Sequence, residues 1–237
     1  MGSTTDGGPV DLDILLALNG FAGRGDVLDA LLVQLSASPV FKGIPLMMLV
    51  WGLWMVPHAH VARRRAGLAA TLVTAVLALA AGRVLSMSLP YRARPIHDSD
   101  LPLRLADTID HGTLNGWSSM PSDHAVLFVA LATGILLVDR RWGLVALAHA
   151  GVVIALPRVI LGFHWPSDIL VGGLIGAGLA LAAVPLLRRL LLDSGLLDWL
   201  EARPGLSYPL MFLVTHQLGT MFTSTRTLLA VLRDVMS

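Results

Sequence analysis

Residues 142–187 read WGLVALAHAGVVIALPRVILGFHWPSDILVGGLIGAGLALAAVPLL and contain two apolar runs, 142–162 and 168–187. Each run has the length of about 20 residues that a helix needs to cross a bilayer. Ionisable side chains are costly at membrane depth, so those that occur there are functional candidates. Three of them stand near the junction of the two runs: Arg158, His164 and Asp168. We predict two spanning helices joined by a turn that carries a functional site.

The composition of the whole chain is typical of a membrane protein. Of its 237 residues, 55% are hydrophobic and 14% are charged, whereas about 25% are charged in a soluble domain. Further apolar runs occupy residues 41–56, 66–89 and 120–138. The runs are continuous rather than alternating, which favours helices over a β-barrel. We predict an all-α polytopic bundle with about five to six spanning helices.

The two ends of the chain are more polar than its centre. Residues 1–39 contain two short segments with acidic side chains, which we expect to form interfacial amphipathic helices or a poor first spanning helix. We expect residues 40–189 to form the transmembrane core and residues 190–237 to form a membrane-associated tail. Within that tail, residues 223–236 have the pattern of an amphipathic helix.

Three arginine clusters predict the orientation of the bundle. They occupy residues 63–65, 140–141 and 188–189, and all three fall on one side if the spans alternate. The positive-inside rule makes that side cytoplasmic. The polar junction at His164 then faces the outer side of the membrane.

Two other polar segments lie beside apolar runs: Arg92-Ala93-Arg94-Pro95 and Pro121-Ser122-Asp123-His124. Their side chains suit a phosphate ester, whose cleavage needs donors for its oxygens, a nucleophile, and an acid for the leaving oxygen. Arginine forks match phosphate oxygens in pairs, and a helix start at Ser122 offers free N–H groups. His124 and His164 supply imidazoles that change charge near neutral pH. Asp168, four residues after His164, could hold its imidazole N–H.

In this order, the motifs resemble those of the type 2 phosphatidic acid phosphatase (PAP2) superfamily, which also includes the vanadium haloperoxidases. The resemblance covers about residues 83–187 and rests on Arg94-Pro95, on Pro121-Ser122-Asp123-His124, and on Arg158, His164 and Asp168. The Pro-Ser-Asp-His variant is similar to bacterial members that act on undecaprenyl diphosphate.

The resemblance implies a role for each matching residue. His164 would attack phosphorus and form a phosphohistidine, and Asp168 would orient His164. His124 would protonate the leaving oxygen. Three residues would bind the phosphoryl oxygens: Arg94, Arg158 and Ser122. The resemblance also implies that neither a metal nor another cofactor is required.

The chain departs from the family pattern at the first basic residue, seven positions before Arg94, where it has Met87. Arg83 would be about 16 Å from Arg94 in a straight helix. The chain must therefore bend after Pro90 for both to contact one phosphate. Arg92 is a rival for this phosphate contact. Each rival has a simpler alternative, a structural ion pair for Arg83 and a lipid headgroup anchor for Arg92.

A second departure places Asp123 where the family has glycine. A carboxylate repels phosphate unless it points away or pairs with an arginine, so we expect Asp123 to do one of these. The polar loop before it also contains several potential metal ligands, but their spacing matches no metal site, and we expect them to be solvated: His97, Asp98, Asp100, Asp110 and His111.

Together these features predict an integral membrane phosphatase that acts on a polyprenyl diphosphate, with its site on the outer face of a bacterial inner membrane. Alternatives are a phosphatidic acid or phosphatidylglycerol phosphate phosphatase, a lipid phosphotransferase, and a non-catalytic lipid-binding or transport protein of the same fold. The expected partners are a membrane lipid phosphate and the bilayer. We expect no nucleic-acid partner, a point on which the net charge of +1 by itself says nothing, and the oligomeric state stays open.

Overall fold

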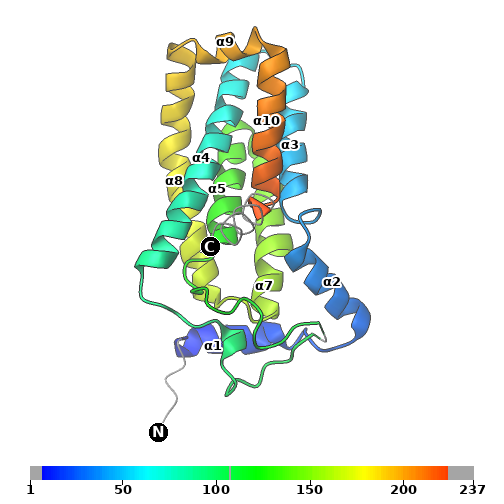
Figure 1. Cartoon of the computed structure of the whole chain (residues 1–237). Coiled ribbons are helices and arrows are strands. Elements are labelled where there is room, and N and C mark those ends of the chain that lie inside the picture. The colour runs from blue at the N-terminus through cyan, green and yellow to red at the C-terminus, as the bar shows by residue number, and fades with distance from the viewer. Residues whose placement is uncertain (1–6, 107, 224–237) are drawn as a thin grey trace, which may run out of the picture.

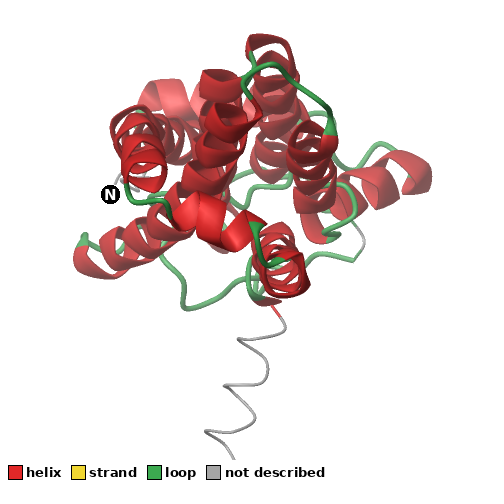
Figure 2. Ribbon diagram, turned by 90° about the horizontal axis from the view of Figure 1, so that it is seen from above, coloured by secondary structure: helices red, strands yellow, loops and turns green. Residues whose placement is uncertain are grey.

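The computed structural model describes residues 7–106 and 108–223. Every regular element in this part of the chain is helical (Figures 1 and 2), which confirms the predicted all-α class. In chain order the helices are α1 (Pro9–Asn19), α2 (Asp26–Ala37), α3 (Gly43–Met55), α4 (Val61–Ser88), the 3-10 turn η1 (Pro95–His97), α5 (Asp123–Val138), α6 (Arg140–His149), the π-helical turn η2 (Ala150–Ala155), α7 (Leu156–Ile160), α8 (Pro166–Asp193), α9 (Leu196–Glu201) and α10 (Pro204–Gly219).

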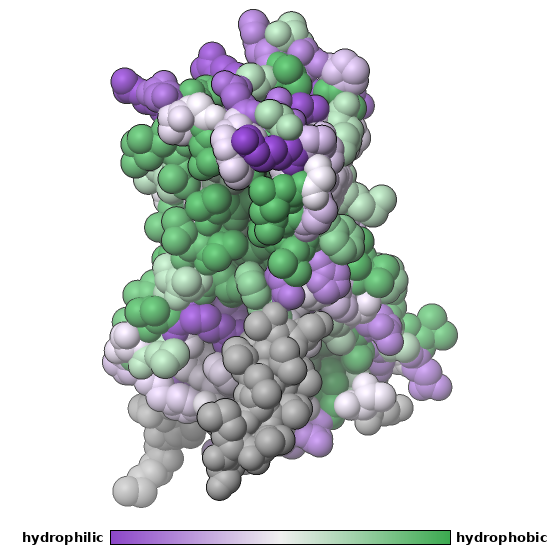
Figure 3. Space-filling model, turned by 45° about the horizontal axis from the view of Figure 1, so that its top comes forward, coloured by the Kyte–Doolittle hydropathy of each residue, from purple (hydrophilic) through white to green (hydrophobic). Residues whose placement is uncertain are grey.

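Five apolar helices lie where the sequence predicts spanning segments. Three of them are long and apolar enough to cross a membrane: α4, α8, and the continuous helix Arg140–Ile160 that α6, η2 and α7 form. The other two, α3 and α5, have 13 and 16 residues, short of the roughly 20 that a bilayer needs. In Figure 3 an apolar band separates two hydrophilic ends of the visible face. The protein is a membrane helix bundle.

The centre of the bundle consists of α4, α5 and α8, which pack against one another. Two glycines one turn apart bring α8 close to α5. A Cβ at Gly176 would lie 2.3 Å from the carbonyl oxygen of Val126, and one at Gly172 would lie 2.7 Å from that of Ser122. Only glycine permits this backbone approach. The contact holds the start of α8 against the start of α5, and so joins two of the predicted motifs.

The three arginine clusters gather at the end of the bundle where α9 lies (Figure 1). Arg64 at the start of α4 lies 3.9 Å from Asp139, next to the cluster at residues 140–141. Arg65 pairs with Glu201 of α9 at 3.3 Å. A Cβ at Gly67 would lie 3.6 Å from the side chain of Arg188, near the end of α8. The clusters therefore share one end, as alternating spans require.

The opposite end is covered by α1, α2 and the long loop between α4 and α5 (Figure 1). Helix α1 lies across this end and buries Leu15 against Val159 and Trp165. Helix α2 buries Leu32 but leaves Leu31 48% exposed. Both segments are helical as predicted, and their position at a membrane interface stays a prediction. The amphipathic helix expected at residues 223–236 falls outside the described residues, apart from its first position.

Helix α10 returns through the bundle and ends against the start of α3. A Cβ at Gly43 would lie 2.2 Å from the carbonyl oxygen of Gly219, so the two backbones are in direct contact. Because both residues are glycines, no side chain separates the two backbones. The residues next to them in sequence therefore also lie close together. Lys42 and Thr220 consequently line the same hollow.

Candidate active site

Four parts of the chain meet at a hollow of about 200 Å³: the last turns of α4, the loop after it, the start of α5, and α7 with its connection to α8. The structure thus brings six of the nine predicted site residues together around one hollow, and all three polar motifs contribute to it. They are Arg83, Arg94, Asp123, His124, Arg158 and His164. The other three predicted site residues do not line the hollow: Asp168, Arg92 and Ser122.

The imidazole of His164 is buried and both of its nitrogens have defined contacts. Nδ1 lies 2.9 Å from the carbonyl oxygen of Ser119. A carbonyl oxygen can only accept, so Nδ1 carries the proton and Nε2 carries the lone pair. Nε2 lies 3.1 Å from Nη1 of Arg94, which can donate to it. This is the tautomer that leaves a lone pair on the nitrogen beside an arginine that is predicted to bind phosphate.

The protonation of this pair follows from its burial. Burial lowers the pKa of His164 below its ordinary value; the hydrogen bond to Asp168 opposes this effect, and the Arg94 guanidinium adds to it. Burial also lowers the pKa of Arg94, while the carboxylates of Asp123 and Asp168 raise it. A lowered histidine pKa keeps the imidazole neutral, and a neutral imidazole is the form that can attack phosphorus.

Asp168, in the first turn of α8, is fully buried and surrounded by donors. Its Oδ2 accepts from the backbone N–H of Trp165 at 2.8 Å and from the hydroxyl of Ser119. Its distance to His164 Nδ1 is 3.5 Å, longer than the 2.9 Å from that nitrogen to the Ser119 carbonyl. Asp168 therefore has a long direct contact with His164 and also accepts from Ser119, whose carbonyl oxygen contacts the same imidazole nitrogen.

Arg92 lies on the far side of Asp168 from the hollow. Its Nη1 is 2.6 Å from Asp168 Oδ1 and 2.8 Å from Ser167 Oγ, and its Nη2 is 2.8 Å from Asp11 Oδ2. Its guanidinium also stacks on the ring of Trp165, 5.5 Å from the centroid. The structure thus places Arg92 between two carboxylates rather than among the residues that line the hollow.

Arg83 does line the hollow, together with Arg94. Helix α4 ends at Ser88 and the chain then turns, which supplies the bend that a shared site requires. Arg83 Nη2 lies 2.6 Å from Asp123 Oδ2, and the guanidinium lies over the ring of Trp117 at 5.1 Å. Asp123 is therefore paired with an arginine, one of the two arrangements that would lessen its repulsion of phosphate.

The second imidazole, that of His124, stands at the start of α5. Its Nδ1 lies 2.8 Å from Asp123 Oδ1, and a carboxylate can only accept, so Nδ1 donates. Nε2 lies 3.5 Å from Nζ of Lys42, and it carries a proton only when the ring is charged. His124 and His164 line the same hollow.

Arg158 on α7 is buried, with 6% of its surface exposed. Its Nη1 donates to the carbonyl oxygen of Ser36 at 3.2 Å. Its Nε has no hydrogen-bond partner among the described residues, although it is buried. A buried donor without a partner is costly, and Arg158 is also one of the residues that line the hollow.

Ser122 caps α5, with its Oγ 3.5 Å from the N–H of Ala125. Its own N–H donates to the carbonyl oxygen of Asp168 at 3.2 Å. The residue is fully buried and links the start of α5 to the start of α8. Its side chain is thus engaged by its own helix rather than exposed to the hollow.

Sequence reasoning missed several side chains that support this site. Ser119 and Ser167 stand next to predicted motif residues, and this closeness in sequence was the available signal. Asp11 and Lys42 come from distant helices, and their contacts with Arg92 and His124 had no local signature. The signal for Lys42 was its rarity, because it is the only lysine in the sequence.

The polar loop before α5 is tied by its own hydrogen bonds. His97 Nε2 lies 2.9 Å from the carbonyl oxygen of Thr113, and His111 Nδ1 lies 2.6 Å from that of Ile96. Within residues 7–106 and 108–223, no group of three or more histidine, aspartate or glutamate side chains is arranged to hold a metal ion.

The comparisons with known proteins agree with the motifs. "Putative undecaprenyl-diphosphatase YbjG" of Escherichia coli K12 is 45% identical over 58 residues, 24% of this chain and 29% of that protein. "Undecaprenyl-diphosphatase" of Sulfolobus acidocaldarius is 32% identical over 66 residues, 28% of this chain and 32% of that protein. The matches thus span less than a third of the length of either relative.

No solved structure matches this chain. The family model of the PAP2 superfamily matches residues 67–191, more than half of the sequence, and this segment runs from α4 through α8. It includes every residue that lines the hollow. The chain belongs to the PAP2 superfamily.

Proposed function

We propose that the protein is a membrane lipid phosphatase that hydrolyses a polyprenyl diphosphate, such as undecaprenyl diphosphate, through a phosphohistidine intermediate. The observation that carries the proposal is the pair of imidazoles on one hollow, with the lone pair of His164 Nε2 beside Arg94. The names of the two relatives support a diphosphate substrate, and the apolar helices around the site support a lipid.

In the first step, His164 Nε2 attacks the terminal phosphorus, and the bond from that phosphorus to the bridging oxygen breaks. The lipid monophosphate leaves, and protonated His124 gives its proton to the departing oxygen. The positive charge that develops on the phosphorylated ring is shared through Nδ1–H with the Ser119 carbonyl and Asp168. Arg94 and Arg158 stabilise the charge on the phosphoryl oxygens.

In the second step, water attacks the phosphohistidine. His124, now neutral, takes a proton from the water, and the nitrogen–phosphorus bond breaks. Inorganic phosphate forms, His164 regains its lone pair, and His124 regains its proton. Each imidazole thus returns to its starting form, and this chain's own side chains carry out both proton transfers.

The arrangement also supports an orientation in the membrane. The arginine clusters lie at the α9 end, and the hollow lies toward the opposite end. By the positive-inside rule the α9 end is cytoplasmic, so the site faces outward in a bacterial inner membrane. A lipid tail would then stay in the bilayer while its headgroup reaches the arginines.

The test is phosphate release by the purified protein in detergent from a panel of polyprenyl diphosphates, polyprenyl monophosphates, phosphatidic acid and phosphatidylglycerol phosphate. We expect the diphosphates to be the best substrates and His164→Ala to abolish release. His58→Ala is the matched control, because His58 is exposed in the loop before α4. Full activity of His164→Ala would remove the proposed nucleophile, and lipid movement without phosphate release would indicate a transporter.

A further inference from the structure

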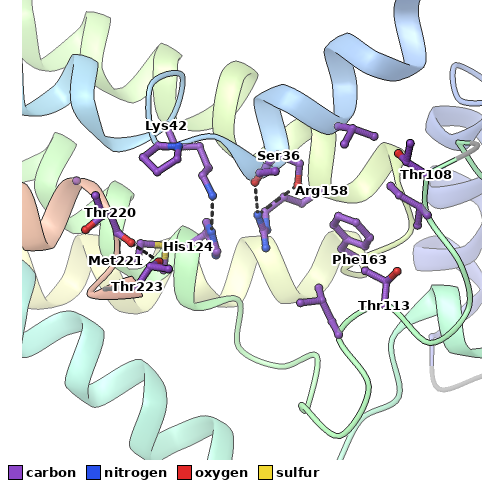
Figure 4. Close-up of a pocket in the computed structure, with 16 residues that line it drawn as sticks. Ser36, Lys42, Thr108, Thr113, His124, Arg158, Phe163, Thr220, Met221 and Thr223 are labelled. Atoms are coloured by element: carbon purple, nitrogen blue, oxygen red, sulfur yellow. Dashed lines mark hydrogen bonds between the residues drawn. The ribbon is translucent and has the colours of Figure 1, made fainter. Parts of the chain in front are cut away.

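The only lysine of the chain lies beside the proposed general acid. Lys42 directly precedes α3, and only 9% of its surface is exposed. Its Nζ lies 3.5 Å from His124 Nε2 and points into a second hollow of about 370 Å³ (Figure 4). Lys42 is thus a buried side chain that lines this hollow directly beside His124.

The backbone around Lys42 is fixed from two sides. Its carbonyl oxygen lies 3.0 Å from Nε2 of His149, which donates to it across the bundle. The next residue, Gly43, is in backbone contact with Gly219 at the end of α10. The backbone from which the Lys42 side chain extends is thus held in place by these contacts.

The two hollows are neighbours that share His124 and Arg158. The first contains His164 and Arg94, where the transferred phosphoryl group would lie. The general acid must stand beside the leaving oxygen, and attack and departure are roughly in line. The leaving group therefore lies on the His124 side of the phosphorus, toward the hollow that Lys42 lines.

The charge of the leaving group decides what this hollow must accommodate. A lipid monophosphate releases an uncharged alcohol, whereas a lipid diphosphate releases a second phosphate that carries negative charge. The hollow offers two buried cations, Lys42 and Arg158, and Arg158 keeps one N–H without a partner among the described residues. Cations in such a place suit an anion and do nothing for an alcohol.

The remaining lining agrees with a phosphate joined to a lipid. Hydroxyl groups of Ser36, Thr220 and Thr223 and apolar side chains of Val33, Ile109 and Met221 border the same space. Figure 4 shows the labelled side chains arranged around it, with Lys42 and Arg158 on one side. The hydroxyls of Thr220 and Thr223 donate to the carbonyl oxygens of His216 and Thr220. The apolar groups suit the first carbons of the lipid chain.

We propose that Lys42, together with Arg158, binds the lipid-linked phosphate of a diphosphate substrate and so makes the protein selective for diphosphates over monophosphates. The proposal rests on the proposed function, since it names the residue that reads the second phosphate at the same site. Lys42 is a specificity-determining residue in this account, and His164 and His124 carry out the chemistry.

The test compares Lys42→Met with the unchanged protein on two lipids that share one prenyl chain, a diphosphate and a monophosphate. We expect kcat/KM to fall about 10- to 100-fold for the diphosphate, the effect of losing one charge-assisted contact, and to stay within about threefold for the monophosphate. Lys42→Arg should recover most of the diphosphate activity because it restores the charge. Arg203→Met, which removes an exposed charge at the α9 end, should change neither.

An equal fall on both lipids would overturn the proposal, because it would mean that Lys42 acts through His124 or through folding. A binding measurement separates this inference from the proposed function. In the His164→Ala background, Lys42→Met should weaken the affinity for a prenyl methylenediphosphonate and not for the matching monophosphonate. If the protein hydrolyses neither lipid but shows this difference, the proposed function fails and the subsite stands. If the two affinities change alike, the subsite is refuted.

Discussion

Replacing Arg92 by methionine should separate a positioning role from phosphate binding. Arg92 joins two carboxylates, Asp168 at 2.6 Å and Asp11 at 2.8 Å, and its side chain is 14% exposed. The variant leaves Asp168 buried without its cation. We therefore expect a less stable protein with a lower kcat, and a KM close to that of the unchanged protein, since Arg92 does not line the hollow.

The magnitude follows from the surroundings of the carboxylate. Removing one partner of a buried ion pair typically costs about 3–5 kcal/mol. Asp168 keeps the N–H of Trp165 and the hydroxyl of Ser119, so we expect a loss at the lower end, about 3 kcal/mol. A misplaced Asp168 would loosen His164, and a small displacement of a reacting group can reduce kcat by about 100-fold.

The assay is thermal unfolding in one fixed detergent, with steady-state kinetics on the same preparations. Arg24→Met serves as the control, because Arg24 is an exposed arginine near the same end of the bundle. The double variant Arg92→Met with Asp11→Asn should recover part of the lost stability by removing one uncompensated carboxylate. A raised KM with an unchanged unfolding temperature would refute the positioning role and would indicate that Arg92 binds the phosphate.

Two further predictions concern the protonation of the nucleophile and the packing of α8. Activity should fall with decreasing pH as His164 becomes protonated, and because its pKa is lowered, the acidic limb of kcat/KM should lie below the ordinary value of about 6.5. Arg94→Gln should move that limb to higher pH, since the guanidinium lowers the pKa. Gly176→Leu should lower the unfolding temperature and abolish activity, because a Cβ there would lie 2.3 Å from the backbone of α5.

Each of these predictions has a contrary result. An acidic limb that stays fixed in Arg94→Gln would mean that another group than His164 is titrating. The matched control for Gly176 is Gly178→Leu in the same helix, where a Cβ would meet no atom within 4 Å. Equal losses in both glycine variants would point to a general effect of the bulky side chain in α8 rather than to the α5 contact.

The linkage between pH and stability has a definite sign for His164. The imidazole is neutral in the folded protein at pH values where the unfolded chain already binds a proton. Lowering the pH below about 6.5 therefore favours unfolding. Above about pH 6.5 the state of His164 does not reduce the stability of the folded protein. Stability is lost as the pH falls from that value toward the lowered pKa of His164 in the folded protein.

Apolar runs revealed most of the bundle because hydrophobic length is a local property of the sequence. The short α3 and α5 were harder to foresee, since apolar residues continue beyond the points where these helices begin or end. In α5 the Ser122 cap fixes the start, and in α3 the backbone contact at Gly43 does so. The start of α5 follows a local signal, the helix start predicted at Ser122, whereas the start of α3 depends on a neighbour in space.

The motifs indicated which polar residues belong together but not how they divide the work. Arg92 and Arg94 are two positions apart, yet one pairs with Asp168 and the other faces the hollow. The partners Asp11 and Lys42 lie 81 and 82 positions from the residues they contact. Such contacts arise from the packing of α1 and α3 on the bundle, and no local pattern in the sequence encodes them.

The acceptor that fixes the proton on His164 belongs to the main chain at Ser119. Every amino acid carries the same carbonyl oxygen, so no substitution at that position can delete it. A replacement there can disturb only the hydroxyl that anchors the loop to Asp168. Homologous enzymes are therefore free to vary this residue while keeping the imidazole in the same tautomer, and an invariant serine would have to be explained by the loop anchor alone.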